Sequence, residues 1–330
     1  MSEEAIVPQR LVIVVPTDAV HDSRTLRIAM SLRGRGHRVT IVARQTSSAA
    51  ALETGPTGIE LIRVACDPID GLPLPAGLRH ALRRAVGVRR PTSRAEPASE
   101  APHGRGRMIE AIRQATRFLA IGLTVRSQER SAALVDLGGD LYHGMAFQGI
   151  PVALGLARRA RSRGIYDIRD IYLDSRNLAR LPGPARRVLQ GLEARWVRDA
   201  TATITVNESC AEVIEHRYGI RPVVVMNCPP RADDDGPPRQ LVRDAVGLTA
   251  ADPVVLYHGG LLAGRGLART IEALADRRLA RAHLVFMGWG EEEAHLRQLA
   301  RGPEVNGRIP SCRRSGRPRS SNGSPPPTSR

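Results

Sequence analysis

The chain has 330 residues, 42% of them apolar, and its 49 basic residues against 33 acidic ones give a formal charge of +16. At about 100–200 residues per domain this length predicts two domains, and without a run of about 18 apolar residues we expect no membrane-spanning helix. The acidic N-terminus is unlike a signal peptide, and four scattered cysteines argue against a zinc site or a disulfide framework, so we expect a cytoplasmic protein.

Short β-branched runs alternate with helical patterns along the chain. Their continuous apolar character is typical of strands that are buried on both faces of a parallel sheet. We predict strands at residues 11–15, 39–43, 59–64, 164–168, 201–206, 222–226, 254–257 and 283–287. Helices are predicted at residues 23–35, 150–163, 184–200 and 208–218. This alternation indicates an α/β protein made of Rossmann-like, doubly wound domains.

Two segments interrupt the alternation. Residues 79–117 hold ten arginines and only three acids, with Pro, Ser and Gly in their middle. Two interpretations stay open: a mobile basic insertion at 79–106, or an arm for an anionic lipid surface that leads into an amphipathic stretch at 108–125. Residues 229–240 are rich in Pro and Asp and are predicted to be a linker. The first domain would then span residues 1–228.

The last thirty residues differ from the rest of the chain. Residues 301–330 carry seven arginines and one acid, with many Ser and Pro and almost no apolar side chains. They are either a disordered basic tail or the product of a shifted reading frame. Residues 311–317 and 320–330 can be written in GC-rich codons, and the neighbouring frame of 320–330 then encodes an amphipathic helix that leads toward a strand. Sequencing the source DNA near codon 308 distinguishes the two hypotheses.

A loop with four glycines follows the predicted strand at 254–257, and a helix begins near Leu267. Such a loop directs backbone N–H groups and the positive end of a helix to the carboxyl edge of the sheet, where a diphosphate can be held. Arg265 adds a guanidinium that is suited to bidentate phosphate contact. A plain tight turn between strand and helix is the alternative.

Further candidates follow other strands. Gly288 and Gly290 come after the strand at 283–287, and they allow a backbone to approach a ligand closely. Asp22 and Arg24 come after the first strand, where they either face a ligand or start the next helix.

The order of these motifs resembles a known family. Tyr-x-Gly-Gly-Leu, Gly-Arg-Gly-Leu, Ile-Glu-Ala-Leu and Leu-Val-x-Met-Gly-x-Gly follow one another in residues 257–290. This order resembles the donor domain of GT-B glycosyltransferases of the family-4-like group. The first half is similar as well, through Asp-Ser-Arg at 22–24, Asp-Leu-Tyr-His at 140–143 and Tyr-Asp-x-x-Asp at 166–170. The resemblance extends from about residue 11 to residue 300.

The resemblance implies transfer of a sugar from a nucleotide diphosphate sugar to a hydroxyl of a polysaccharide, a glycolipid or a small molecule. The donor would be held between two Rossmann-like domains, and the reaction would be retaining. The implied donor-binding residues are Gly259, Gly260, Arg265, Gly288 and Gly290. The implied catalytic residues are His143 and Arg265, and those on the acceptor side are Asp22, Arg24 and Asp170. Arg265 would meet the charge that gathers on the leaving diphosphate, so neither a metal nor a cofactor is expected.

His143 by resemblance faces the sugar or the attacking hydroxyl, and a histidine that bonds only to backbone is the alternative. The chain also departs from the family. The family pairs the lysine of the donor loop with an arginine just after the strand, whereas this chain has Arg265 and Gly260 at those positions. The acidic Glu-x7-Glu pattern is not found after Leu299. We therefore expect a truncated donor domain at 241–300 and a poorly soluble chain that is weakly active or inactive.

Other classes of protein receive less support. All 49 basic residues are arginines, a skew that GC-rich codons produce, so the charge alone does not predict nucleic-acid binding. Asp233–Asp235 follow two prolines in the linker, and no metal site is expected there. A non-catalytic Rossmann-like binding or regulatory protein stays open. The first strand lacks a following Gly-x-Gly-x-x-Gly, which argues against a dehydrogenase. The basic segment 79–117 favours peripheral contact with an anionic inner membrane face.

Overall fold

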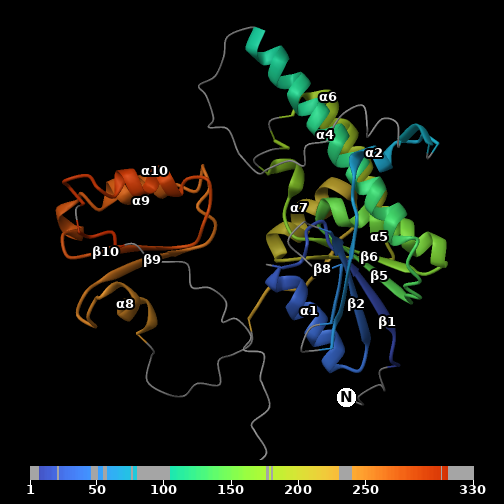
Figure 1. Cartoon of the computed structure of the whole chain (residues 1–330), viewed down its shortest axis with the longest axis horizontal. Helices are drawn as coiled ribbons and strands as arrows, with labels where there is room; N and C mark the ends of the chain where they lie inside the picture. Colours follow the sequence, from blue (N-terminus) through green and yellow to red (C-terminus); the bar gives the residue numbers. More distant parts are fainter. Residues whose placement is uncertain are drawn as a thin grey trace, which may run out of the picture. The chain divides into compact units, whose positions relative to one another are not determined.

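The computed structural model describes residues 7–20, 22–45, 51–54, 58–75, 77–79, 105–175, 178–179, 181–229, 240–305 and 307–310, with backbone alone at 70–71 and 105–117. The chain forms two compact units (Figure 1). Unit 1 holds the described residues up to 229, and unit 2 holds those from 240 onward. Most of the predicted basic insertion, the interior of the predicted linker and the tail beyond 310 lie outside the described residues.

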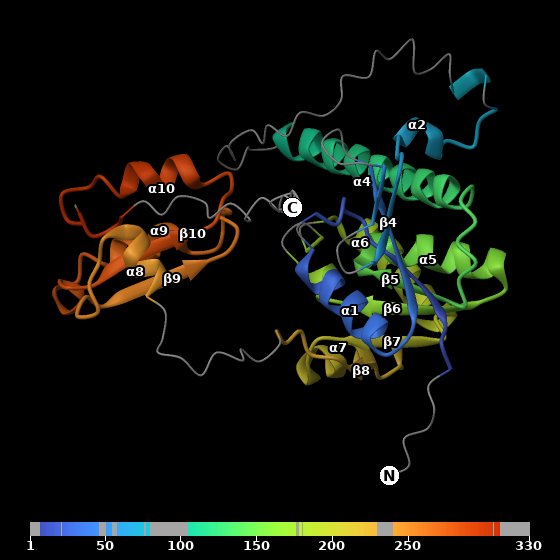
Figure 2. The same ribbon diagram turned by 60° about the horizontal axis from the view of Figure 1, so that its bottom comes forward.

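Unit 1 is built on one eight-stranded sheet with the order β3-β4-β2-β1-β5-β6-β7-β8. Figure 2 labels its strands β4 to β8. The strands are β1 (Arg10–Val14), β2 (Arg38–Arg44), β3 (Leu52–Thr54), β4 (Glu60–Val64), β5 (Leu141–Met145), β6 (Arg163–Ile168), β7 (Ala202–Thr205) and β8 (Val223–Val224). All neighbouring strands are parallel except β3, which runs antiparallel to β4. The chain order reverses at β1, which lies between β2 and β5. Ligands of doubly wound sheets bind at the carboxyl ends of the strands beside such a switch point.

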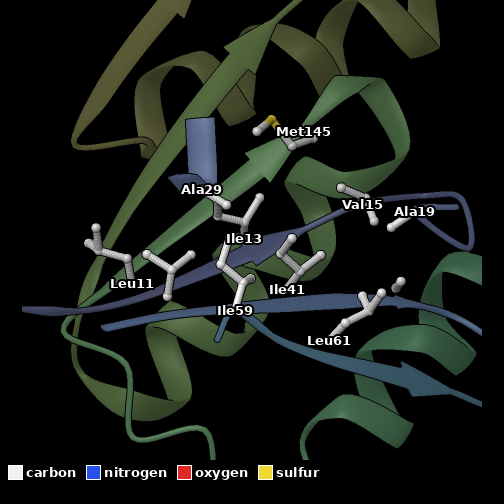
Figure 3. Packing of buried hydrophobic residues seen from close by; sticks show 11 residues of the cluster. Leu11, Ile13, Val15, Ala19, Ala29, Ile41, Ile59, Leu61 and Met145 are labelled. Atoms are coloured by element: carbon white, nitrogen blue, oxygen red, sulfur yellow. The ribbon is translucent and has the colours of Figure 1, made fainter. Parts of the chain in front are cut away.

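Helices cover both faces of this sheet. They are α1 (Ser23–Gly34), α2 (Pro68–Gly71), α4 (Arg105–Ala132), α5 (Ala146–Ala160), α6 (Gly183–Asp199) and α7 (Glu208–Tyr218), with a short 3-10 helix η1 (Tyr172–Asp174). Alternate residues of β1 pack on opposite sides: Ile13 lies in the cluster with Ala29 of α1 (Figure 3), and Val12 lies in the cluster with Val152 of α5. Burial on both faces explains why the run at 11–15 is apolar at every position.

Unit 2 is smaller. It holds the parallel strands β9 (Val254–His258) and β10 (His283–Met287), the helices α8 (Leu241–Val246), α9 (Leu267–Ala273) and α10 (Glu293–Leu299), and the 3-10 helix η2 (Arg277–Leu279). Its core gathers seven buried residues, namely Leu261, Leu267, Ile271, Leu274, Leu284, Leu296 and Val305. Val255 and Leu256 of β9 remain 43% and 46% exposed. Two apolar residues in succession are exposed because β9 has only one partner strand in the described part of unit 2.

All eight predicted strands overlap strands of the structure, and the predicted helix at 208–218 coincides with α7. The prediction at 222–226 was too long, because β8 has two residues. The helix predicted from residue 150 begins at Ala146, directly after β5. Its first residue takes a left-handed φ of 61° that usually calls for glycine, and Pro151 lies in its second turn. Both features hid the true start of α5.

Candidate functional site

The carboxyl end of the unit 1 sheet gathers charged side chains from three segments. Register places His143 of β5 opposite Ile13, and Asp167 of β6 opposite Met145. Ile13 and Met145 belong to the core cluster on the α1 side of the sheet, so His143 and Asp167 also face α1. The first turn of α1 carries Arg24 to the same place.

Asp167 is the centre of this cluster and is completely buried. Arg24 donates a hydrogen bond of 3.0 Å from Nη2 to Asp167 Oδ1. The second carboxylate oxygen, Oδ2, lies 3.6 Å from His143 Nε2 and 3.8 Å from Arg169 Nε. A buried carboxylate is stable only when it is paired, and two guanidinium groups supply that compensation here.

Asp22 starts α1 as its N-cap. Its carboxylate accepts hydrogen bonds from the backbone N–H of Thr25 at 3.0 Å and from the Thr25 hydroxyl at 2.7 Å. Arg169 Nη1 lies 3.2 and 3.1 Å from the two Asp22 oxygens. Burial by itself would raise the pKa of Asp22, but the charge of Arg169 and the hydrogen bonds outweigh burial and hold that pKa below its usual value. Asp22 therefore stabilises the helix start, which was one of its two predicted roles.

Asp170 does not join the cluster. Its side chain is exposed and forms no ion pair with the described residues. Asp167, three residues earlier, occupies the buried position, and Arg169 between them bridges to Asp22. The sequence holds a signal for this arrangement: a carboxylate within an apolar strand demands a nearby cation. The role of Arg169 was missed.

Residues 259–266 of unit 2 form the loop between β9 and α9, which we call the donor loop after its predicted role. It turns at three glycines with positive φ: Gly259 at 148°, Gly264 at 76° and Gly266 at 74°. Its first half runs beside the segment that follows β10. Gly259 N donates to the Met287 carbonyl at 3.0 Å, and Leu261 N donates to the carbonyl of residue 289 at 2.9 Å. The two loops thus extend the pairing of the parallel strands β9 and β10.

Gly288 and Gly290 are required by this contact. A Cβ at Gly288 would lie 1.8 Å from the Gly259 carbonyl oxygen, and one at Gly290 would lie 2.1 Å from the Leu261 carbonyl oxygen. Their lack of a side chain therefore lets the two loops approach each other. Contact of these glycines with a ligand stays a prediction.

The Arg265 side chain is exposed, and its guanidinium forms no hydrogen bond or ion pair within the described part of the chain. Backbone N–H groups of the same loop, at Gly260, Ala263, Gly264 and Gly266, likewise donate to no described acceptor. The loop thus combines a guanidinium and several N–H donors without bound acceptors. Such a set can hold a phosphate. Gly260 is exposed, and its carbonyl accepts a hydrogen bond of 2.8 Å from the Tyr257 hydroxyl.

Other kinds of site find less support. No three His, Cys, Asp or Glu side chains in the described ranges lie close enough to hold a metal ion, and Asp233–Asp235 lie outside those ranges. A cavity of about 630 Å³ is lined by Arg10, Arg38 and Glu60, which stand at the amino ends of their strands. It is therefore at the opposite edge of the sheet from the Asp167 cluster. No described helix is long and apolar enough to cross a membrane.

Comparison with known proteins shows the fold. No protein-family model and no curated protein sequence matches the chain. Sucrose-phosphate synthase from Thermosynechococcus elongatus matches with a TM-score of 0.61 and 14% identity, over 93% of this chain and 70% of that one. The catalytic domain of starch synthase IV from Arabidopsis thaliana, bound to ADP and acarbose, matches with a TM-score of 0.58 and 10% identity, over 94% and 75%. Anabaena HepE in complex with UDP and glucose matches with a TM-score of 0.51 and 13% identity, over 92% and 68%.

These structures are GT-B glycosyltransferases, so the predicted resemblance is confirmed and the chain has the GT-B fold. It spans 68–75% of the length of the matched chains. Unit 2 has two strands in its described part. Both observations agree with the prediction of an incomplete second domain.

Proposed function

We propose that the protein is a glycosyltransferase that moves a sugar from a nucleotide diphosphate sugar to a hydroxyl acceptor. The donor loop carries this proposal: it follows a parallel strand, and it presents Arg265 and unpaired N–H groups in a chain with the GT-B fold. Two of the matched structures hold a nucleoside diphosphate, UDP in one and ADP in the other.

The chemistry follows from charge. When the bond between sugar and diphosphate breaks, negative charge gathers on the leaving diphosphate and needs donors that are already in place. Arg265 and the N–H groups of Gly260 and Gly264 are such donors, and we expect them to act without a divalent cation. We also expect the anomeric configuration of the sugar to be retained, which NMR of the product would test.

Unit 1 would supply the acceptor side. His143, the middle residue of β5, is 6% exposed, and we expect it to contact the sugar or the attacking hydroxyl. The acceptor would be a polysaccharide of the cell envelope, a glycolipid or a small molecule. Peripheral contact with an anionic membrane stays a prediction, because most of the basic segment 79–117 lies outside the described residues or has only its backbone described.

Binding of nucleoside diphosphates tests the donor site. The purified chain would be titrated calorimetrically with UDP, GDP and ADP, and one of them should bind. Arg265→Ala should weaken that binding about 10- to 100-fold, because hydrogen bonds to charged groups contribute about 1.5–3 kcal/mol. Arg281→Ala is the matched control: Arg281 is also an exposed arginine of unit 2, but it precedes the amino end of β10. Equal losses in both variants, or no binding at all, would refute the proposed site.

A second candidate is a binding protein without catalysis. Gly260 favours it, because the family resemblance implies an arginine there and the chain presents only one cation in this loop. Nucleotide binding without any sugar transfer would support this alternative.

A further inference from the structure

Four buried atoms around Asp167 have no hydrogen-bond partner among the described residues: Arg24 Nε, His143 Nε2, Asp167 Oδ2 and Arg169 Nε. Three of them face one another, since Oδ2 lies 3.6 Å from His143 Nε2 and 3.8 Å from Arg169 Nε. An unpaired buried polar atom is costly, so a group of them at the carboxyl end of a sheet calls for a functional explanation.

The carboxylate is held in a defined orientation. Arg24 Nη2 fixes Oδ1 at 3.0 Å, which turns Oδ2 toward His143. His143 and Asp167 lie on adjacent parallel strands and on the same face of the sheet, so their backbones form a rigid frame. A small rotation of the imidazole would shorten the 3.6 Å distance between Nε2 and Oδ2 to the length of a hydrogen bond. Catalytic hydrogen bonds often shorten in this way when a ligand binds.

Donor and acceptor chemistry then selects one form of the imidazole. An ionised carboxylate only accepts hydrogen bonds, so the nitrogen that faces Asp167 Oδ2 must carry the proton. Neutral imidazole has a single N–H, and the other nitrogen, Nδ1, is therefore an acceptor. An Nδ1 acceptor binds a hydroxyl group through the hydroxyl proton.

We propose that Asp167 is a positioning residue that holds His143 in the Nε2–H form, so that Nδ1 accepts a hydrogen bond from a hydroxyl of the sugar donor or of the acceptor. The identity of that hydroxyl rests on the proposed function. The orientation of Asp167 toward His143 is observed in the structure and does not rest on that function.

Nitrogen NMR of the protein labelled with ¹⁵N-histidine tests this proposal without any substrate. Spectra would be recorded over a series of pH values, and the form would be assigned where the His143 nitrogen signals show one protonated and one unprotonated nitrogen. The chain has nine histidines, and the signals of His143 are those that disappear in His143→Gln. We expect a single Nε2–H form in the unaltered protein. A protonated Nδ1, or a mixture of both forms, would overturn the proposal, and this outcome needs no folded variant of Asp167.

Asp167→Asn should invert the form of the imidazole. Arg24 Nη2 needs an acceptor at its 3.0 Å contact, so the amide carbonyl turns to Arg24 and the amide NH₂ faces His143. Nε2 then becomes the acceptor and Nδ1 carries the proton. Glu193→Gln is the matched control, because Glu193 is a buried carboxylate that accepts a hydrogen bond from Tyr166, on the opposite face of β6. The His143 signals should not change in that control, and unchanged signals in Asp167→Asn would refute the proposal.

Turnover supplies a second reading. If the chain transfers sugar, Asp167→Asn should lower kcat/KM by about 10- to 100-fold, the loss seen when the carboxylate that orients a histidine is removed at metal sites, while Glu193→Gln should leave it unchanged. The Nε2–H form without any nucleotide binding would refute the proposed function and preserve the role of Asp167. Nucleotide binding together with a protonated Nδ1 of His143 would refute the role of Asp167 and leave the proposed function intact.

Discussion

The contact between the donor loop and the segment after β10 predicts a large effect of one methyl group. In Gly288→Ala the new Cβ would lie 1.8 Å from the Gly259 carbonyl oxygen, although Cβ atoms essentially never come within 3.0 Å of such an atom. The two loops must therefore separate by about 1.2 Å. The nearest atoms to this Cβ are backbone atoms of Gly259, so no flexible side chain can yield instead.

The cost follows from the contacts that separation breaks. The hydrogen bonds from Gly259 N to Met287 O and from Leu261 N to the carbonyl of residue 289, now 3.0 and 2.9 Å long, would become too long. Each contributes about 1 kcal/mol, and strain from overpacking adds about 1–3 kcal/mol. We expect Gly288→Ala to lower the free energy of unfolding of unit 2 by about 3–5 kcal/mol.

Urea unfolding combined with hydrogen exchange measures this loss. Peptides that contain β10 report on unit 2 alone, so the result does not depend on whether the two units unfold together. Gly260→Ala is the matched control in the facing loop: its φ is not positive, and its Cβ meets only the side chain of Leu262 at 3.3 Å. That variant should change stability by no more than about 0.5 kcal/mol. If the amides of β10 show the same protection from hydrogen exchange in both variants, the packing of the two loops is not as described.

Three further predictions concern charge. Gly260→Arg should tighten binding of a nucleoside diphosphate, measured by calorimetry, because it adds a second cation where a Cβ fits; weaker binding would contradict the assignment of the loop. Nucleotide binding and any sugar transfer should survive excess EDTA, and a loss restored by Mg²⁺ would refute independence from metal. The pKa of Asp22 is lowered in the folded protein, so its stabilising effect is present above about pH 4 and is lost as the pH falls through its folded-state pKa. Asp22→Asn should therefore destabilise the protein at pH 7 and have less effect near pH 2.5, as urea unfolding would show; a difference that does not change with pH would contradict this.

The sequence was most informative where one local rule decides the structure. Burial on both faces made the strands of the parallel sheet readable as continuous apolar runs, for example at β1 and β10. A left-handed φ without glycine, as at Ala146, gives no local signal, so the start of α5 could not be predicted. The edge strand β3 was missed for a different reason: its three residues are exposed, so they form no apolar run.

The sequence predicted which residues lie near the site better than it predicted which residues they contact. His143, Asp22 and Arg24 all lie at the carboxyl end of the unit 1 sheet, but their contacts depend on Asp167 and Arg169. The contacts of Arg24 with Asp167 and of Asp22 with Arg169 join residues more than one hundred positions apart, because α1 and β6 meet only after the sheet has formed. Periodicity along the chain cannot reveal such a pairing. Gly288 shows the same limit, since the loop that requires it lies almost thirty residues earlier.

The two units use their charges differently, and this difference bears on where a diphosphate would bind. In the Asp167 cluster of unit 1, Arg24 is paired with Asp167 and Arg169 is paired with Asp22, so carboxylates already compensate both cations. In unit 2, Arg265 has no carboxylate partner among the described residues. A diphosphate that approached the unit 1 cluster would have to displace a carboxylate from a guanidinium, whereas at the donor loop it would displace only water. We therefore expect a diphosphate to bind at the donor loop of unit 2 rather than at the Asp167 cluster of unit 1.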